Sequence, residues 1–261
     1  AEGLSGTEQD FVVLMNEKAE EIGLENTNFN NSSGINDVNN YSTVRDILKM
    51  SRYMIQNYPE YYSYFKETSF TWDRTGGDPI TQGNRNPLLY KNIGADGMKT
   101  GHTKEAGYGL AATALRNGRR LILVLMGMDS ARQRSIEAER ILDYGFRKFS
   151  NYNLFGKDEI VESADIWLGQ LSRVPLVLED GLTITLPRDV RKNLMVTVIF
   201  ESPIPAPVDA GEVIAKLVIK TSDTSVMELP LVAGKSVPRA GPFKRISGAL
   251  SYMLFGPPLD G

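Results

Sequence analysis

The residues best suited to chemistry lie in one short stretch that consists of Lys99, Thr100, Gly101, His102 and Thr103. A cation, two hydroxyls and the single histidine of the chain thus fall within five consecutive positions. The glycine leaves room where the backbone of another molecule could come close. Such an arrangement favours the binding of an extended peptide along an exposed strand edge. An ordinary hairpin with a surface lysine is the alternative.

A turn signal predicts the strands that would carry this stretch. β-favouring runs cover 108–115 and 120–126, and between them lies Asn117-Gly118, a dipeptide typical of hairpin turns. Together with the strand of Lys99, these runs predict an antiparallel meander.

A helix is predicted directly after the meander, from an N-cap at Ser130 to about Phe149. Arg134 lies near its start, where the helix dipole disfavours a cation by a few tenths of a kcal/mol up to about 1 kcal/mol. A charge in an unfavourable position invites a functional interpretation, and Arg132 and Arg140 are close enough to be alternatives. The residues predicted to face inward are Ile136, Ile141, Leu142 and Phe146.

Two more helices are predicted nearer the N-terminus. Thr7 is a plausible N-cap for a helix to about Ile22, and a second helix starts at Ser42 and ends before Pro59. The segment 26–41 is rich in Asn, Ser and Gly, which predicts an ordered loop. The first helix has an apolar face that we expect to pack in the core, formed by Phe11, Leu14, Met15, Ala19 and Ile22.

The pattern between the second helix and the meander is short and irregular. Residues 58–65 are aromatic and predict a short helix packed on the core, because no basic residues interleave as in a base-stacking platform. A short strand is predicted at 70–72, followed by glycine-rich turns. Arg85 lies in the next loop, where it either contacts a substrate, supports the site or is simply solvated.

From Asn151 onward the sequence consists of short β-rich segments separated by Gly, Pro and Asp. Regular short strands with turns between them predict a small all-β sandwich. We therefore expect an α+β chain with an antiparallel sheet and helices in 1–151, a β-sandwich domain in 152–240, and a terminal helix and tail in 241–261. The predicted strands of the sandwich are 160–163, 166–168, 174–178, 182–186, 195–200, 213–219 and 226–231.

The segment 241–256 returns to helical periodicity, with Lys244, Arg245, Ser247 and Ser251 away from an apolar face. The segment is too short to span a bilayer, but an amphipathic helix can lie in a membrane interface. A helix packed on its own β-domain or on a partner is the alternative. The apolar face consists of Phe243, Ile246, Ala249, Leu250, Met253 and Leu254.

Composition excludes several classes of function. A net charge of −3 and a pI near 5.4 argue against a general polyanion binder, so we expect no nucleic-acid partner. The absence of cysteine rules out thiolate metal sites and a cysteine nucleophile, and a single histidine rules out a multi-histidine metal centre. We therefore expect neither a metal nor a cofactor.

The longer run that contains the candidate stretch is more specific than its residue types. Residues 96–108 have the pattern Asp-Gly-x-Lys-Thr-Gly-x-Thr-x-x-Ala-Gly-Tyr, which resembles the serine-type D-alanyl-D-alanine carboxypeptidases among the low-molecular-mass penicillin-binding proteins. The Asn-Arg-Asn at 84–86 and the segments 24–29 and 41–46 are similar to the same family. The resemblance is strong before Asn151 and weaker after it, where these carboxypeptidases carry a C-terminal β-domain.

The resemblance implies acyl transfer on the terminal D-Ala-D-Ala of a peptidoglycan stem peptide. A serine attacks, a lysine one helical turn later takes its proton, D-alanine leaves, and water hydrolyses the acyl-enzyme. The resemblance also implies a periplasmic enzyme of cell-wall biosynthesis and cell shape that β-lactam antibiotics bind. The segment 241–256 would attach it to the outer face of the cytoplasmic membrane.

The resemblance assigns roles to the residues singled out above. Lys99 would supply positive charge near the attacking group, and the backbone N–H of His102 would be one oxyanion donor. Thr100 and Arg134 would hold the terminal carboxylate of the substrate. The remaining residues implied in substrate binding are Gly101, Thr103 and Arg85.

The implied nucleophile, a Ser-x-x-Lys serine, has no convincing match. The only such spacing is Ser63 to Lys66, in the aromatic segment, which we interpret as a coincidence, and the second motif of the family, Ser-x-Asn, is absent. We therefore expect the C-terminal portion of a longer enzyme that needs the upstream part of the same protein and is inactive alone. The alternatives are a catalytically silent cell-wall binding or scaffolding protein on the same fold, or a β-lactamase.

Overall fold

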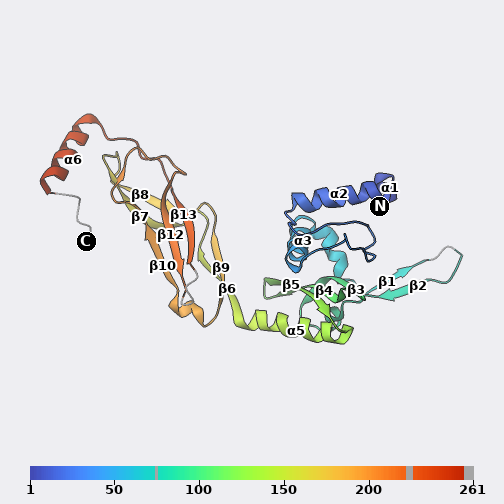
Figure 1. Cartoon of the computed structure of the whole chain (residues 1–261). Coiled ribbons are helices and arrows are strands. Elements are labelled where there is room, and N and C mark those ends of the chain that lie inside the picture. Colours follow the sequence, from blue (N-terminus) through green and yellow to red (C-terminus); the bar gives the residue numbers. More distant parts are fainter. Residues whose placement is uncertain (74–75, 222–225, 256–261) are drawn as a thin grey trace. The chain divides into compact units, whose positions relative to one another are not determined.

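The structure is a computed structural model that describes residues 1–73, 76–221 and 226–255. The chain divides into two compact units, Ala1–Arg147 and Lys148–Gly261 (Figure 1). The first unit combines helices with a central sheet, and the second consists mainly of strands. The predicted α+β fold is therefore confirmed.

The first unit is built on a three-stranded antiparallel sheet. Its strands are β3 (Ala95–Thr103), β4 (Gly107–Arg116) and β5 (Arg119–Met128), in the order β3-β4-β5. Asn117 and Gly118 connect the last two strands with φ angles of 50° and 74°, the positive values that a tight two-residue hairpin turn requires. The predicted meander is confirmed, and β3 is an edge strand that has no partner along its outer side among the described residues.

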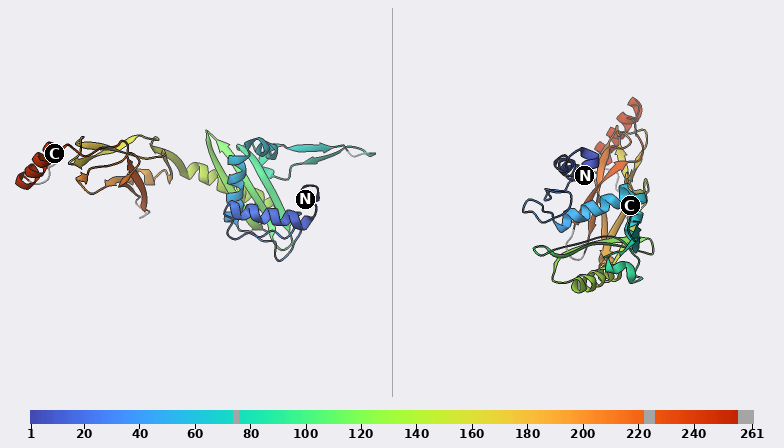
Figure 2. Two further views of the ribbon diagram at one scale, coloured as in Figure 1. Left: turned by 90° about the horizontal axis from the view of Figure 1, so that it is seen from above. Right: turned by 90° about the vertical axis from the view of Figure 1, so that its right-hand side faces the viewer.

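Helices cover both faces of this sheet (Figures 1 and 2). α5 (Ala131–Lys148) packs on one face, and α3 (Val44–Asn57) packs on the other. Successive side chains of β4 point to opposite faces, so Ala112 meets the α5 cluster whereas Ala111 meets the cluster of α3. The sheet is thus a layer between two helical layers.

The first long helix begins at its predicted cap. α2 (Glu8–Glu21) follows the short α1 (Glu2–Ser5), and the Thr7 hydroxyl accepts a hydrogen bond from a backbone N–H of the first turn at 3.1 Å. The predicted core face is only partly right, since Ala19 is buried whereas Leu14 is 49% exposed. The described part of the chain leaves that side of the helix open to solvent.

The predicted cap of the second helix is wrong by one residue. Thr43, not Ser42, caps α3 by accepting a hydrogen bond from Asp46 N at 3.1 Å. The Ser42 hydroxyl instead contacts the Thr27 hydroxyl at 2.8 Å, so a contact with the preceding loop decides between two neighbouring candidates. Ser130 caps α5 as predicted, with a hydrogen bond of 3.0 Å from the first turn.

The prediction that Ile136 faces inward from α5 is also wrong. Ile136 is 50% exposed, whereas Ala138, which is not among the predicted residues, is buried. The buried row of α5 has a spacing of four residues and contains Arg134, Ala138, Leu142 and Phe146. Ile136 lies about 200° around the helix from this row, at 100° per residue. Arg134 is therefore the charged member of a buried row.

The segment before the sheet is short and irregular, as predicted. α4 (Pro59–Tyr62) and the 3-10 helix η1 (Ser63–Lys66) follow α3, and η2 (Pro87–Tyr90) precedes β3. The predicted strand is β1 (Ser69–Trp72), which pairs with β2 (Ile80–Gly83) in a hairpin that projects from the unit (Figure 1). β2 is not predicted, because its residues lie among glycine turn signals.

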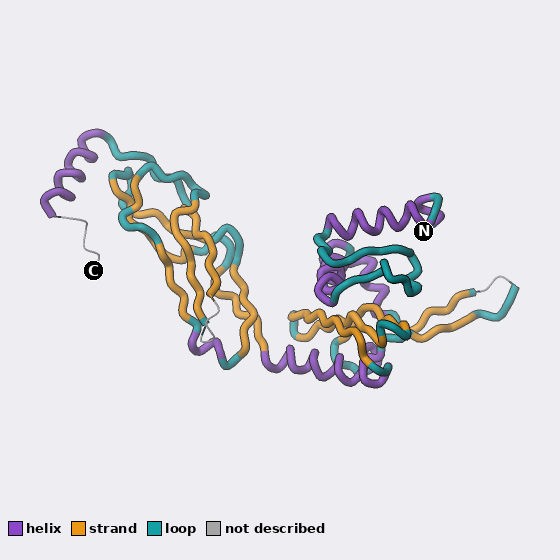
Figure 3. Tube along the Cα trace, viewed as in Figure 1, coloured by secondary structure: helices purple, strands orange, loops and turns teal. Residues whose placement is uncertain are grey.

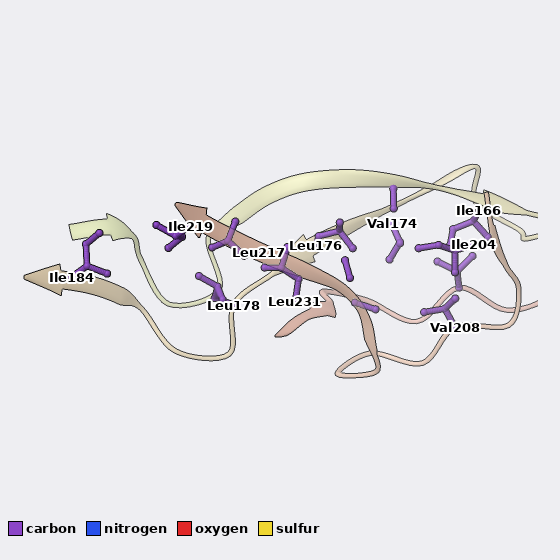
Figure 4. Packing of buried hydrophobic residues seen from close by; sticks show 14 residues of the cluster. Ile166, Val174, Leu176, Leu178, Ile184, Ile204, Val208, Leu217, Ile219 and Leu231 are labelled. Carbon is purple, nitrogen blue, oxygen red and sulfur yellow. The ribbon is translucent and has the colours of Figure 1, made fainter. Parts of the chain in front are cut away.

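The second unit contains two sheets around one apolar core. Its elements are β6 (Phe149–Phe155), β7 (Ile160–Trp167), β8 (Arg173–Val177), β9 (Leu182–Pro187), η3 (Val190–Asn193), β10 (Met195–Ile199), β11 (Ile204–Pro205), β12 (Val213–Lys220) and β13 (Val226–Ala233). The larger sheet has the order β10-β12-β13-β8-β7-β11, and β6 pairs with β9. Leu176, Leu217 and Leu231 of the larger sheet share a buried cluster with Ile184 of the smaller one (Figure 4).

Two strands of this unit are not predicted from the sequence, and one strand is predicted as two separate strands. The predicted strands 160–163 and 166–168 form the single strand β7. β6 begins directly after α5 without a Gly or Pro breaker, and β11 has only two residues, paired in parallel with β7. These strands are fixed by partners distant in the sequence, which local periodicity does not reveal.

The last described element is α6 (Pro242–Phe255), whose bounds are close to those of the predicted helix (Figure 3). Gly256, where the predicted helix ends, and the tail to residue 261 lie outside the described residues. In the part of the chain that the structure describes, no helix is both long and apolar enough to cross a membrane.

Candidate active site

β3 carries the candidate stretch on an edge strand. By alternation along the strand, Lys99, Gly101 and Thr103 share one face of the sheet, and Thr100 and His102 share the other. Lys99 and Gly101 are exposed, and a Cβ placed on Gly101 would meet no atom within 4 Å. The space that the sequence predicts at this glycine is present.

Within the described residues, the hydrogen bonds of Lys99 and Thr103 are local. Lys99 Nζ donates a hydrogen bond to Thr100 O at 2.5 Å. Thr103 Oγ1 accepts one from Ala106 N at 3.0 Å, which closes the turn into β4. The lysine head is therefore exposed at the surface of the strand, while the Thr103 hydroxyl has a structural partner.

The His102 ring lies flat against Tyr108 of the next strand. The two ring centroids are 3.8 Å apart with an interplanar angle of 11°, and His102 Nδ1 lies 3.3 Å from Gly107 O. The imidazole is thus held by stacking and by one local contact.

Arg134 extends from α5 to the sheet and is buried, with 7% of its surface exposed. Its Nη1 and Nη2 donate to Gly109 O and Arg85 O, both at 3.4 Å, and its guanidinium carbon lies 5.7 Å from the Tyr108 ring centroid. Among the described residues, Nε finds no hydrogen-bond partner and no carboxylate pairs with the guanidinium. Burial disfavours the charged form of the guanidinium and so lowers the pKa of Arg134. A buried cation with long hydrogen bonds and no counter-ion is suited to bind an anion.

These contacts bring Arg134 close to the edge strand. Gly109, whose carbonyl it contacts, pairs with Gly101, and Tyr108 pairs with His102. The Arg85 side chain is exposed, but the Arg85 carbonyl belongs to the same cluster. The structure thus places Arg134 of α5 one strand away from Gly101 and His102 of β3 and in contact with the backbone of the loop before η2.

The two alternatives to Arg134 on α5 lie elsewhere. Arg140 Nη2 pairs with Glu137 Oε2 at 2.7 Å, one turn away on the same helix, and Arg132 is exposed. Of these three arginines, Arg134 is the buried one that contacts the sheet.

A polar cluster that is not predicted from the sequence lies at the start of β3. Asp96 Oδ1 accepts hydrogen bonds from Tyr62 Oη and Thr113 Oγ1, both at 2.8 Å. Arg120 donates to both carboxylate oxygens, at 2.7 and 2.6 Å. Burial favours a higher pKa for Asp96, but the hydrogen bonds from Arg120, Tyr62 and Thr113 outweigh it and hold the pKa below its usual value. Burial and the adjacent carboxylate raise the pKa of Tyr62 to about 12.

Ser63, the one serine with a lysine at the required spacing, is exposed on η1. Its hydroxyl donates to Glu60 O at 2.6 Å, at the end of α4. In the described structure, Lys66 forms no hydrogen bond with it. This geometry supports the interpretation of the spacing as a coincidence.

No metal centre is evident in the part of the chain that the structure describes. None of its clusters of three or more His, Cys, Asp or Glu side chains has a metal-binding arrangement.

Comparison with known families divides the chain much as the structure does. The family described as D-alanyl-D-alanine carboxypeptidase matches residues 1–130. The family described as Penicillin-binding protein 5, C-terminal domain, matches residues 149–239.

Individual relatives are similar over most of the chain. D-alanyl-D-alanine carboxypeptidase DacC of Escherichia coli (strain K12) is 34% identical over 94% of this chain and 61% of that protein. DacA of Haemophilus influenzae is 33% identical over 94% of this chain and 62% of that protein. A crystal structure of penicillin binding protein 5 from Haemophilus influenzae matches with a TM-score of 0.80 and 32% identity, over 91% of this chain and 69% of that one. The chain thus spans 61% to 62% of the length of these two curated relatives.

The fold is that of the penicillin binding protein 5 class, with an α+β unit followed by a C-terminal β unit. The chain belongs to the D-alanyl-D-alanine carboxypeptidase family. The resemblance found in the sequence is confirmed, and it extends through the β-rich half.

Proposed function

We propose that this chain is part of a serine-type D-alanyl-D-alanine carboxypeptidase that removes the terminal D-alanine from peptidoglycan stem pentapeptides and is sensitive to penicillin. The observation that carries the proposal is the edge strand β3, which presents Lys99 and the open Gly101 and pairs with the β4 residues that the buried Arg134 contacts. An edge strand can bind an extended peptide through its backbone groups. The names of the relatives carry the same activity.

In the proposed reaction, a serine Oγ attacks the carbonyl carbon between the two D-alanines, and its proton passes to the lysine of the same Ser-x-x-Lys pair. The C–N bond then breaks, the leaving D-alanine takes up a proton, and water hydrolyses the ester. Lys99 supplies positive charge beside the attacking group. The backbone N–H of His102 stabilises the oxyanion, a contribution of about 3 kcal/mol for such donors.

The substrate ends in a carboxylate, and Arg134 with the Thr100 hydroxyl is the group proposed to hold it. A guanidinium can bind a carboxylate through two parallel hydrogen bonds. The long contacts of Arg134 with Gly109 O and Arg85 O leave donors that a carboxylate can engage more closely. Gly101 and Thr103 line the same strand, and Arg85 supports the cluster through its carbonyl.

We further propose that the nucleophile is not one of these 261 residues. Ser63 is engaged with Glu60 O, and no other serine is followed by a lysine at the required spacing. The chain then contributes the Lys-Thr-Gly wall of the site and depends on a further segment of the same protein for catalysis.

Mass spectrometry after penicillin treatment tests the function. We expect the complete protein to gain one acyl adduct and to release D-alanine from a D-Ala-D-Ala peptide, and we expect this chain alone to do neither. A Ser63→Ala variant of the complete protein should keep both activities. An adduct on Ser63 would show that the proposal assigns the nucleophile wrongly.

The other outcomes of the same experiment identify the alternatives. Rapid turnover of penicillin by the complete protein would favour a β-lactamase. Neither an adduct nor turnover in the complete protein would favour a catalytically silent cell-wall binding protein.

The proposed location is the periplasm, with α6 attached peripherally to the outer face of the cytoplasmic membrane. Phe243, Ile246, Leu250 and Met253 recur every three or four residues and are all exposed, which leaves an apolar helix face uncovered. The side chains of two further residues predicted for this face lie outside the described part of the chain, namely Ala249 and Leu254. Exposed Arg245 can contribute about 1 kcal/mol near an anionic lipid surface.

Flotation with vesicles that contain anionic lipid tests the attachment. A Phe243→Asp/Met253→Asp double variant should remain unbound, because it places charge on the apolar face. Ser247→Asp, which adds a charge beside the apolar residues without replacing one, is the control and should still float. Equal flotation of the double variant and the unchanged protein would favour a helix packed on its own domain or on a partner.

A further inference from the structure

The start of β3 sets the register of the strand that carries Lys99. We propose that Asp96, held by Arg120, Tyr62 and Thr113, is a positioning residue for the candidate stretch. It acts through the backbone of β3 and needs no contact with the substrate. The inference rests on the proposed function, because it concerns the same site.

Asp96 is an extra residue in the pairing of β3 with β4. Ala95 pairs with Ala114 and Gly97 pairs with Thr113, so two steps along β3 match one step along β4. Such a bulge shifts the pairing register of the residues that follow it. Lys99 therefore keeps its pairing with Ala111 only if the bulge is kept.

The consequence of losing the bulge follows from the register. With the bulge, Lys99 pairs with Ala111, whose side chain belongs to the cluster of α3. Without it, Lys99 would lie opposite Leu110, which is buried against α5. The pairing of Lys99, and with it the position of the candidate stretch along the edge of the sheet, therefore depends on the bulge.

The hydrogen bonds of Asp96 hold the bulge in place. The donors come from three different elements, with Tyr62 on α4, Thr113 on β4 and Arg120 on β5. The Arg120 fork contacts both carboxylate oxygens, which fixes the orientation of the carboxylate as well as its position. The carboxylate thus ties β3 to both other strands of the sheet and to the helix above it.

The next residue is held from both sides. A Cβ on Gly97 would lie 2.8 Å from Tyr62 Oη and 3.0 Å from Thr113 Oγ1, so the backbone here packs directly on the cluster. Gly97 O accepts a hydrogen bond at 2.8 Å from the Asn86 side chain, which is fully buried. Lys99 follows two residues later and has only its own local contact, so its position depends on this backbone.

The test compares variants of the complete protein in their reaction with penicillin. Asp96→Asn and Arg120→Gln should each slow acylation by about 10- to 100-fold, since a misplacement of about 1 Å can cost 100-fold. The non-covalent step should change by less than about 3-fold, because neither side chain contacts the ligand. The double variant should be no slower than about the worse single variant, because the two residues act as one unit.

Asp143→Asn is the matched control. Arg116 Nη1 and Asp143 Oδ1 form an ion pair at 2.7 Å that ties β4 to α5, with side-chain exposures of 28% and 39%, against 24% for both Arg120 and Asp96. In the described part of the chain, neither residue of this ion pair forms a hydrogen bond or ion pair with the candidate stretch. We expect it to lower the melting temperature by a similar amount while acylation stays unchanged. If Asp143→Asn slowed acylation as much as Asp96→Asn does, the inference would be overturned.

Amide hydrogen exchange gives a measurement that does not depend on the reaction. Exchange of residues 98–103 should rise in Asp96→Asn and stay unchanged in Asp143→Asn. If the unchanged protein is not acylated at all, the proposed function fails, while exchange still decides whether Asp96 positions the strand. Protection of 98–103 that is equal in both variants would refute the positioning role.

Discussion

The first unit buries polar as well as apolar side chains, whereas the described part of the second unit buries only apolar ones. Within the described residues, every buried polar or charged side chain belongs to the first unit, namely Asp46, Ser51, Asn86, Thr113 and Arg134. The buried cluster of the second unit consists of Val, Leu, Ile and Ala side chains (Figure 4). Burial of polar groups destabilises a fold unless they are hydrogen-bonded, so it is retained where it fixes geometry.

This difference indicates a division of tasks. Buried polar residues of the first unit hold strands and loops at defined positions; Asp46, for example, accepts hydrogen bonds from Asn26 N at 2.8 Å and Thr27 Oγ1 at 2.9 Å. The second unit has no comparable buried polar group among its described residues. Mutations in the two units should therefore affect different properties.

The largest expected effect lies in the second unit. Leu217→Ala should lower the free energy of unfolding of this unit by about 2–5 kcal/mol, because Leu217 is fully buried and a cavity would remain. Urea denaturation measures the loss, and Leu171→Ala at an exposed leucine should cost less than about 0.5 kcal/mol. Penicillin acylation, measured below the transition, should be unchanged. A matching fall in acylation would contradict the division of tasks.

Arg134 should show the opposite behaviour. Arg134→Ala should lower kcat/KM for a D-Ala-D-Ala peptide by about 10- to 150-fold, since a hydrogen bond to a charged group contributes about 1.5–3 kcal/mol. Arg134→Lys should restore only part of the rate, because lysine cannot form the two-pronged contact. Steady-state kinetics measure both variants, with Arg132→Ala as the exposed control on the same helix. An unchanged kcat/KM in Arg134→Ala would remove Arg134 from the site.

A smaller effect is expected in acid. In the folded state, burial favours a higher pKa for Asp46 and Asp96, but their hydrogen bonds outweigh it and lower both values. A lowered folded pKa gives stability that is present above the unfolded pKa of about 3.9 and is lost as the pH falls through the folded pKa. The first unit should thus lose stability as the pH falls below about 4.

Thermal unfolding across this pH range measures the effect. Asp96→Asn should give a shallower pH profile for the first unit, because one of the two carboxylates no longer titrates. An identical slope in the variant and the unchanged protein would show that Asp96 does not contribute to the acid sensitivity.

Local patterns in the sequence determine much of the fold and part of the candidate site. Asn117-Gly118 predicts its hairpin, and Thr7 and Ser130 predict their helix starts, because backbone angles and caps depend on neighbouring residues. The Lys99 stretch predicts an edge strand open to a ligand. Arg134 becomes a candidate because a cation near a helix start is locally unfavourable.

The tertiary structure decides which distant residues meet. Tyr62 and Arg120 lie 34 and 24 residues from Asp96 in the sequence, and they reach it only when three strands and a helix assemble. The bulge at Asp96 shifts the register by one residue, which no periodicity in β3 reveals. Ile136 is exposed for a related reason, because apolar spacing defines possible helix faces whereas the position of the sheet selects the buried one. Short-range preferences thus determine the elements, and long-range packing determines which of their side chains form the site.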